Sequence, residues 1–329
     1  MSDFEFKSSM HGLNPEENKT MKLNSAPVDE SEDEDHCVLN WATDENPTKK
    51  SKMHPIKSQG ACGSCWAFAA ATAQEGAQAI KDDRDPVRLS EQEGVDCVAD
   101  SHGCNGGWMD HFWEFSKAAG SQTDEDYPYE AKDVSCRYQE GKTIASQVTG
   151  HAQMHTIHEM KAAIRNGPAT IAVAAGSDCW RFYKTGILSK ENKCPTDLDH
   201  GVVVIGLHVG TDDDASPKPK PDEDFDEETE THRQCKKSTR SERQNEKCVR
   251  DDAFLHPNHL GEANQKCCWY LDYAFAQVSS ESKDHSEHDH DTSYWIIQNS
   301  WGSGWGDNGY IKLAVEPGVG VSGMNEYFQ

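Results

Sequence analysis

KSQGACGSCWAF, at residues 57–68, holds the clearest chemical signal in this chain. Gly63 and Ser64 precede a run that extends from Cys65 to about Lys81, rich in Ala, Gln and Glu with an apolar face. This composition predicts a helix with Ser64 near its N-cap and Cys65 in its first turn. A thiol in that position feels the positive end of the helix dipole, which favours the nucleophilic thiolate. Cys65 is therefore a candidate nucleophile.

A cysteine nucleophile needs a base, and the base needs a group that orients it. The segment LDHGVVVIG (198–206) places His200 at the head of an apolar, β-branched strand. The segment YWIIQNSWGSGWGDNGY (294–310) places Asn299 at the end of a second strand, with Trp301 just after it. The chain therefore contains a candidate base and a candidate orienting group for the thiol.

Each of these residues also has a structural interpretation. A lone His on an apolar strand is usually a satisfied core side chain, and Cys62 and Cys65 could form a structural or metal-binding pair. No second half of a metal site is apparent, and the catalytic roles fall in chain order inside long motifs. These motifs resemble those of the papain/cathepsin cysteine proteases, cathepsin L in particular. Gln59 matches the oxyanion-hole glutamine of that family, and the resemblance covers most of 37–209 and 294–329.

Composition argues against several other classes of protein. The 329 residues carry a formal net charge of −25 at pH 7, which disfavours nucleic acid and anionic membranes as partners. No uninterrupted apolar stretch is long enough to span a bilayer. Twelve cysteines indicate an oxidising setting, lysosomal, endosomal or secreted, although residues 1–20 have no signal-peptide pattern. We therefore expect Met1 to be an internal methionine of a fuller precursor.

The resemblance implies an α+β fold of two lobes, with substrate bound between them. Residues 37–145 are expected to form a helical left lobe, and 146–209 with 294–329 a β-barrel-like right lobe. Residues 1–36 resemble the last part of a cathepsin L-type propeptide followed by an acidic linker, with maturation expected within 28–37. A pro-segment this short is expected to inhibit poorly.

Residues 210–293 form an acidic insertion that the family's short hairpin does not need. Its first part has the charge and proline content of disorder, whereas 253–278 is apolar enough for a small folded patch. The His cluster at 283–291 could bind a divalent metal, but a solvated linker is the favoured interpretation. Because the strands that carry His200 and Asn299 should run antiparallel, the insertion is expected to start roughly 20 Å from the chemistry. We interpret it as an interaction or regulatory appendage.

The cysteines are only partly explained by the resemblance. It implies the disulfides Cys62–Cys104 and Cys97–Cys136, each stabilising the left lobe by about 2–4 kcal/mol. The family's partner for Cys194 lies near the C-terminus, where this chain has Ser322. With Cys65 set aside, an odd number remains, so at least one is free, metal-bound or paired between chains. These seven are Cys37, Cys179, Cys194, Cys235, Cys248, Cys267 and Cys268.

The resemblance implies peptide-bond hydrolysis by a thiolate–imidazolium pair, without cofactor or metal. Cys65 attacks, His200 transfers the proton, Asn299 orients the imidazole, and Trp301 shields that contact from water. The Gln59 amide and the Cys65 backbone N–H are expected to form the oxyanion hole. Expected partners are protein or peptide substrates and cystatin-type inhibitors, and the chain is expected to be monomeric.

Further positions match substrate-binding residues of the family. Gly106, Gly107 and Asp199 are expected beside the substrate backbone, where a missing side chain at Gly107 permits close approach. Five residues match the lining of the S2 pocket, and its short base predicts Val or Leu at P2 over Phe or Arg. They are Trp108, Met109, Ala172, Leu198 and Tyr327. No occluding insertion follows Cys104, which indicates an endopeptidase. The alternative is a catalytically silent scaffold whose acidic insertion binds partners or metal.

Overall fold

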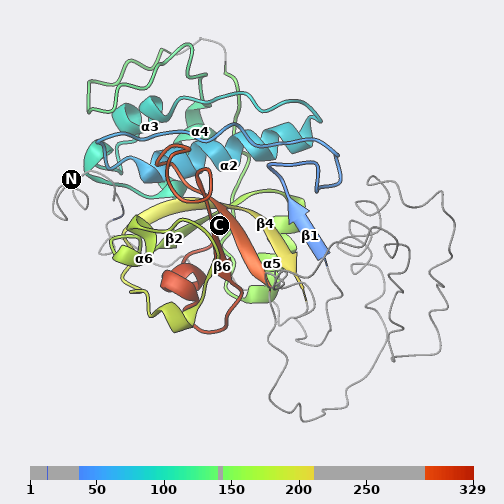
Figure 1. Ribbon diagram of the computed structural model, residues 1–329. Helices are drawn as coiled ribbons and strands as arrows, with labels where there is room; N and C mark the ends of the chain where they lie inside the picture. The colour runs from blue at the N-terminus through green and yellow to red at the C-terminus, as the bar shows by residue number, and fades with distance from the viewer. Residues whose placement is uncertain (1–12, 14–36, 140–143, 211–292) are drawn as a thin grey trace, which may run out of the picture.

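The computed structural model describes Leu13 and residues 37–139, 144–210 and 293–329. The rest of the expected pro-segment, and the interior of the acidic insertion with its cysteines and His cluster, lie outside the described residues. In the described ranges, the helices within residues 65–119 lie on one side, and a mixed sheet lies on the other together with the helices within 157–181 (Figure 1). This arrangement confirms the expected α+β fold. None of the helices described is both long enough and apolar enough to cross a membrane.

The left lobe is organised around α2 (Cys65–Lys81), whose bounds match the predicted helix. Its small alanine side chains allow α4 (Met109–Ala119) to pack closely, so that the Trp113 indole on α4 reaches the Ala70 carbonyl at 3.1 Å. α2 is therefore buried along most of its length. The same lobe contains α3 (Glu91–Cys97) and the 3-10 turn η2 (Gly103–Asn105). The remaining helices lie within the residues of the right lobe: α5 (Ile157–Asn166), α6 (Asp178–Arg181), η3 (Lys190–Asn192) and η6 (Val321–Glu326).

The right lobe is built on one sheet with the strand order β1-β4-β5-β6-β3, and β2 also pairs with β4. All the pairs are antiparallel except β3 with β6. The central strand β4 is buried along almost all of its length and packs against α2, which joins the two lobes (Figure 1). The strands are β1 (Cys37–Asn40), β2 (Ala169–Val173), β3 (Ile187–Leu188), β4 (His200–Val209), β5 (Tyr294–Gln298) and β6 (Tyr310–Ala314).

The pairing of β4 with β5 sets where the insertion leaves the fold. Val203 lies opposite Gln298 and His208 lies opposite Tyr294, so the two strands are antiparallel as predicted. His200 and Asn299 lie at one end of this pair, and the chain leaves for the insertion at the other end. The insertion therefore leaves the fold at the end of the strands opposite His200 and Asn299.

The expected lobe boundary at residue 37 needs a correction. β1 does not belong to the helical lobe, because its four residues pair with β4 from Cys37 opposite Val209 to Asn40 opposite Gly206. Leu39 on this strand is buried, so the pairing adds apolar area to the core of the right lobe. A Cβ at Gly206 would lie 2.3 Å from the Leu39 carbonyl oxygen, so this close approach of β1 requires glycine.

The disulfides extend beyond those that the resemblance implied. Cys62–Cys104 and Cys97–Cys136 are both present. A third bond joins Cys179 to Cys194, a pairing that the sequence had left open. In place of the family's C-terminal cysteine, the Ser322 hydroxyl accepts a hydrogen bond of 2.9 Å from the Trp180 indole.

Glu93 on α3 gives the fold a dependence on pH. Its carboxylate is fully buried and accepts the Gln122 backbone N–H at 2.9 Å. Burial raises the pKa of Glu93 to about 7. Because this pKa is above the unfolded value, protonation of Glu93 favours the folded chain, and this contribution to stability is complete below about pH 4.5. That contribution is lost as the pH rises through about 7.

We expect Glu93→Gln to flatten the fall in melting temperature between pH 5 and pH 8, because the substituted amide cannot ionise. Melting curves at both pH values measure the effect. Glu125→Gln removes an exposed carboxylate and is the control, expected to keep the wild-type dependence. An unchanged pH dependence in Glu93→Gln would show that Glu93 is not its source.

Candidate active site

Cys65 begins α2 where this helix meets the sheet, and its side chain is fully buried. The thiol is not in a disulfide. The backbone N–H of Gly201, near the start of β4, points to the Cys65 sulfur at 3.4 Å. A backbone donor and the N-terminal end of a helix both stabilise negative charge, so this position favours the thiolate.

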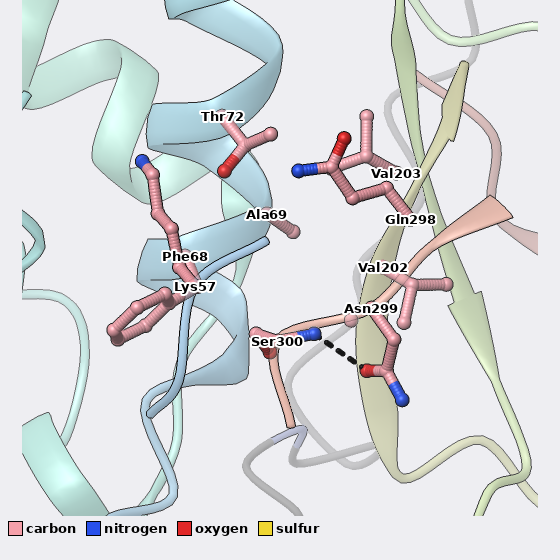
Figure 2. Close-up of a pocket in the computed structure, with 10 residues that line it drawn as sticks. Lys57, Phe68, Ala69, Thr72, Val202, Val203, Gln298, Asn299 and Ser300 are labelled. Atoms are coloured by element: carbon pink, nitrogen blue, oxygen red, sulfur yellow. Dashed lines mark hydrogen bonds between the residues drawn. The ribbon is translucent and has the colours of Figure 1, made fainter. Parts of the chain in front are cut away.

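The His200–Asn299 contact fixes the proton on the imidazole. The Asn299 side-chain oxygen accepts the Ser300 backbone N–H at 2.8 Å, which identifies this atom as oxygen (Figure 2). The same oxygen lies 2.8 Å from His200 Nε2. Because an amide oxygen can only accept, Nε2 must carry a hydrogen. In neutral His200, Nδ1 is then the nitrogen that can take a proton from the thiol.

Tryptophan rings surround His200. The ring centroids of Trp301 and Trp180 lie 4.7 Å and 6.3 Å from that of the imidazole. Trp305 completes the group, stacked on Trp180 at 6.0 Å and edge-on to Trp301 at 5.0 Å. These apolar rings lower the local dielectric, which strengthens the His200–Asn299 hydrogen bond.

Gln59 is buried and its side chain is held at both ends. The Ser300 hydroxyl donates to Oε1 at 2.8 Å, and Nε2 donates to the Cys62 carbonyl at 2.9 Å. An amide nitrogen has two hydrogens, so Gln59 can keep this contact and still donate to an oxyanion. The Gln59 backbone N–H also donates to the Ser300 carbonyl at 2.9 Å, which links the segment to the end of β5.

A buried ion cluster lies two residues before Gln59. The Lys57 ammonium contacts the carboxylates of Glu75 at 2.6 Å and Glu91 at 2.5 Å. Burial raises the pKa of Glu75 to about 7, although Lys57 opposes this shift. For Lys57 the two carboxylates outweigh burial and raise its pKa. Lys57 therefore stays positively charged, whereas Glu75 takes up a proton as the pH falls through about 7.

A small cavity lies between α2 and the sheet, with room for about one water molecule. Ala69 and Thr72 of α2 line one side of it, and Val202, Gln298 and Asn299 line the other (Figure 2). It is too small for a peptide side chain, so it is not the substrate site.

Gly106 and Gly107 follow η2, and the structure adds a second reason for glycine at Gly107. A Cβ there would lie 2.5 Å from the Ser101 hydroxyl oxygen and 2.7 Å from the Trp66 ring. Gly106 has φ of 118°, which disfavours other residues. Packing behind the chain requires Gly107, in addition to any approach of substrate.

Tyr327 contacts two of the other residues matched to the S2 pocket, Trp108 and Ala172, and most of the five are buried. The Trp108 and Tyr327 rings lie 4.8 Å apart, and the Tyr327 hydroxyl contacts Asp110 and Gln329 at 3.3 Å and 2.9 Å. Met109 and Ala172 are fully buried, and Leu198 is partly buried against the same core. The Tyr327 side chain is therefore held by the packing of its ring and by the contacts of its hydroxyl.

Asp199 has a role that its family match did not reveal. Its carboxylate accepts the backbone N–H groups of Ala175 at 2.7 Å and Gly176 at 3.0 Å, which fixes the turn before α6. Its carbonyl oxygen accepts the N–H of Leu13 at 3.3 Å. Leu13 also packs against the hydrophobic core. Leu13 thus contacts the residue immediately before His200.

Several contacts that organise the site were not predicted from the sequence. Ser300 holds both Asn299 and Gln59, and Tyr129 contacts Ser64 and the Gln59 carbonyl. Ser64 is the N-cap of α2 as predicted, but its hydroxyl makes no capping hydrogen bond. Apart from the bond between Ser300 and Asn299, these contacts join residues that are far apart in the chain. In the described ranges no group of three or more His, Cys, Asp or Glu side chains could hold a metal ion.

The comparisons with known proteins agree with this geometry. The family model described as "Papain family cysteine protease" matches residues 39–216 and 264–327, which is most of the chain. The chain therefore belongs to the papain family of cysteine proteases.

Individual relatives are similar over long ranges. Digestive cysteine proteinase 3 of Homarus americanus is 31% identical over 281 residues, covering 84% of this chain and 60% of the relative. Procathepsin L of Rattus norvegicus is 29% identical over 322 residues, covering 96% and 70%. The solved bromelain protease from Ananas comosus, in complex with the E64 inhibitor, has a TM-score of 0.58 and 25% identity. That match covers 88% of this chain and 96% of bromelain. The chain thus spans about 60% of the length of the lobster relative.

Proposed function

We propose that this chain is a cysteine endopeptidase that uses Cys65 as nucleophile and His200 as its proton carrier. The observation that carries this proposal is the hydrogen bond from His200 Nε2 to Asn299, because it directs Nδ1 to take the thiol proton. The Gly201 N–H, which points to the Cys65 sulfur, would stabilise the negative charge of the resulting thiolate. A scaffold without activity would not need this arrangement.

The proposed reaction has two stages. The Cys65 thiol gives its proton to His200, and the thiolate attacks the peptide carbonyl carbon. The C–N bond then breaks, the leaving amine takes the proton from His200, and an acyl thioester remains on Cys65. Water, deprotonated by His200, hydrolyses the thioester and regenerates the thiol.

Negative charge on the carbonyl oxygen is proposed to bind the Gln59 side-chain amide and the Cys65 backbone N–H. N–H groups at the start of a helix point toward bound anions, and Cys65 is the first residue of α2. Both groups are fixed before substrate arrives, which is the condition under which such donors stabilise a transition state most.

Residues 1–36 are proposed to act as a pro-segment over the substrate site, with maturation within 28–37. The hydrogen bond from the Leu13 N–H to the Asp199 carbonyl supports this, because it brings Leu13 to the residue that precedes His200. Protein or peptide substrates, cystatin-type inhibitors, a lysosomal, endosomal or secreted location and a monomeric state complete the proposal. The acidic insertion is proposed to be an interaction or regulatory appendage.

The S2 pocket is proposed to accept Val or Leu at P2 in preference to Phe or Arg. Tyr327 shortens its base, since the ring packs on Trp108 and its hydroxyl is held by Asp110. We expect dipeptide-coumarin substrates with Val or Leu at P2 to have the highest kcat/KM under mild reduction between pH 4 and 8. One extra ring in a closed apolar pocket should cost Phe about tenfold or more. Equal turnover of Phe and Leu substrates would contradict this assignment. No turnover of any substrate, even after trimming the chain to about residue 37, would contradict the proposed activity.

A further inference from the structure

Tyr129 joins two segments of the active site through its hydroxyl. The hydroxyl oxygen lies 2.8 Å from the Gln59 carbonyl oxygen and 2.6 Å from the Ser64 hydroxyl oxygen. A carbonyl can only accept, so Tyr129 must donate to Gln59. The tyrosine hydroxyl has one hydrogen, so Ser64 must donate to Tyr129. The direction of both hydrogen bonds is therefore fixed.

The two segments are those that carry the proposed oxyanion donors. Gln59 supplies the side-chain amide, and Ser64 immediately precedes Cys65, which supplies the backbone N–H. The Gln59 main chain is thus held from two directions, with its N–H bonded to Ser300 and its C=O bonded to Tyr129. The Ser64 hydroxyl serves this bridge and makes no capping bond with α2.

Tyr129 is itself fixed by its surroundings. Its backbone N–H donates to the Asp124 carboxylate at 3.2 Å. Its ring meets Phe68 of α2 edge-on, with the centroids 4.8 Å apart. Burial raises the pKa of the Tyr129 hydroxyl, so it stays protonated and continues to donate wherever the enzyme would work. The bridge is therefore a rigid link between the loop and the nucleophile helix.

We propose that Tyr129 is a positioning residue for the oxyanion hole, a role that rests on the proposed function. Its hydroxyl sets the separation between Gln59 and the start of α2, and so the distance between the two oxyanion donors. Such donors must lie within about 2.7–3.1 Å of the developing oxyanion, and small displacements cost rate steeply.

Tyr129→Phe in the full-length chain tests this role, because it keeps the ring on Phe68 and removes only the hydroxyl. We expect kcat for a dipeptide-coumarin substrate to fall about tenfold, with KM changed by less than about twofold. Alkylation of Cys65 by chloroacetamide forms no oxyanion, so its rate and pH profile should match the wild type. A loss in turnover without a loss in alkylation is the signature of misplaced oxyanion donors.

Tyr127→Phe is the matched control on the same loop. The Tyr127 hydroxyl donates to Asp96 at 2.8 Å and accepts the Arg137 backbone N–H at 2.9 Å. Its loss should lower the melting temperature and leave kcat within about twofold of the wild type. The assignment is overturned if Tyr129→Phe keeps wild-type kcat, or if turnover and alkylation fall by the same factor. Absence of turnover in the wild-type chain, even after trimming to about residue 37, would instead overturn the proposed function itself.

Discussion

Cys65→Ala is expected to lower peptide turnover by at least about 10⁴-fold, because it removes the sulfur atom proposed to attack the carbonyl. His200, Asn299 and Gln59 would keep their contacts with one another and with Ser300. The replacement deletes one buried sulfur atom, so the fold and the melting temperature should change little. Turnover of a dipeptide-coumarin substrate from pH 4 to 8 under mild reduction measures the loss.

Active-site titration supplies the control for this comparison. An epoxide that alkylates activated thiols should label the wild-type chain once and should not label Cys65→Ala. Turnover that survives in Cys65→Ala would contradict the assignment of the nucleophile. A wild-type chain that takes up the epoxide but cleaves no peptide would shift the interpretation to the catalytically silent scaffold.

Lys57→Met is expected to lower the free energy of unfolding by about 3–5 kcal/mol at pH 7.5, because it leaves Glu75 and Glu91 buried without their shared cation. Both carboxylates contact the Lys57 ammonium, and Glu75 also accepts the Leu89 backbone N–H at 2.7 Å. Protonation of Glu75, whose pKa burial raises to about 7, should reduce the loss at pH 5. Urea unfolding at the two pH values measures both effects.

Lys52→Met is the matched control for this substitution. Lys52 is also buried, and its ammonium lies 2.8 Å from the Asp83 carboxylate. The Asp83 side chain is 82% exposed, so water screens this ion pair. Its loss should cost about 1 kcal/mol or less. Adding Glu75→Gln to Lys57→Met should recover part of the stability, because it removes one of the two buried charges. Equal losses for Lys57→Met and Lys52→Met would contradict the role given to the cluster.

The elements with strong local signals were predictable from the sequence. The helix from Cys65 to Lys81 follows from a run of good helix formers after Ser64, and its bounds are confirmed. The β-branched run after His200 predicted β4, and the antiparallel partner that ends near Asn299 is also confirmed. These predictions depend on residues close together in the sequence, which is where propensity and capping act.

Contacts between distant side chains were not predictable in the same way. The pairing of Cys179 with Cys194 depends on how the loop around α6 folds, and cysteine counting alone left it open. The Tyr129 hydroxyl contacts Gln59 across 70 positions, so no local pattern indicates it. β1 was assigned to the wrong lobe because four residues carry too little signal to show which strand they pair with.

The insertion leaves β4 and returns to β5 at the ends opposite His200 and Asn299, and this has a consequence for a chain that is cleaved within the insertion. β4 and β5 are held side by side by their own ladder and by the strands on either side of them, and do not depend on an unbroken connection between them. Loop-closure entropy grows only slowly with loop length, so a long connection costs little more than a short one. A nick within the insertion would therefore give a two-chain protein whose heavy piece carries Cys65 and His200 and whose light piece carries Asn299. The two pieces would remain joined by backbone hydrogen bonds, as in a split enzyme that has already reassembled.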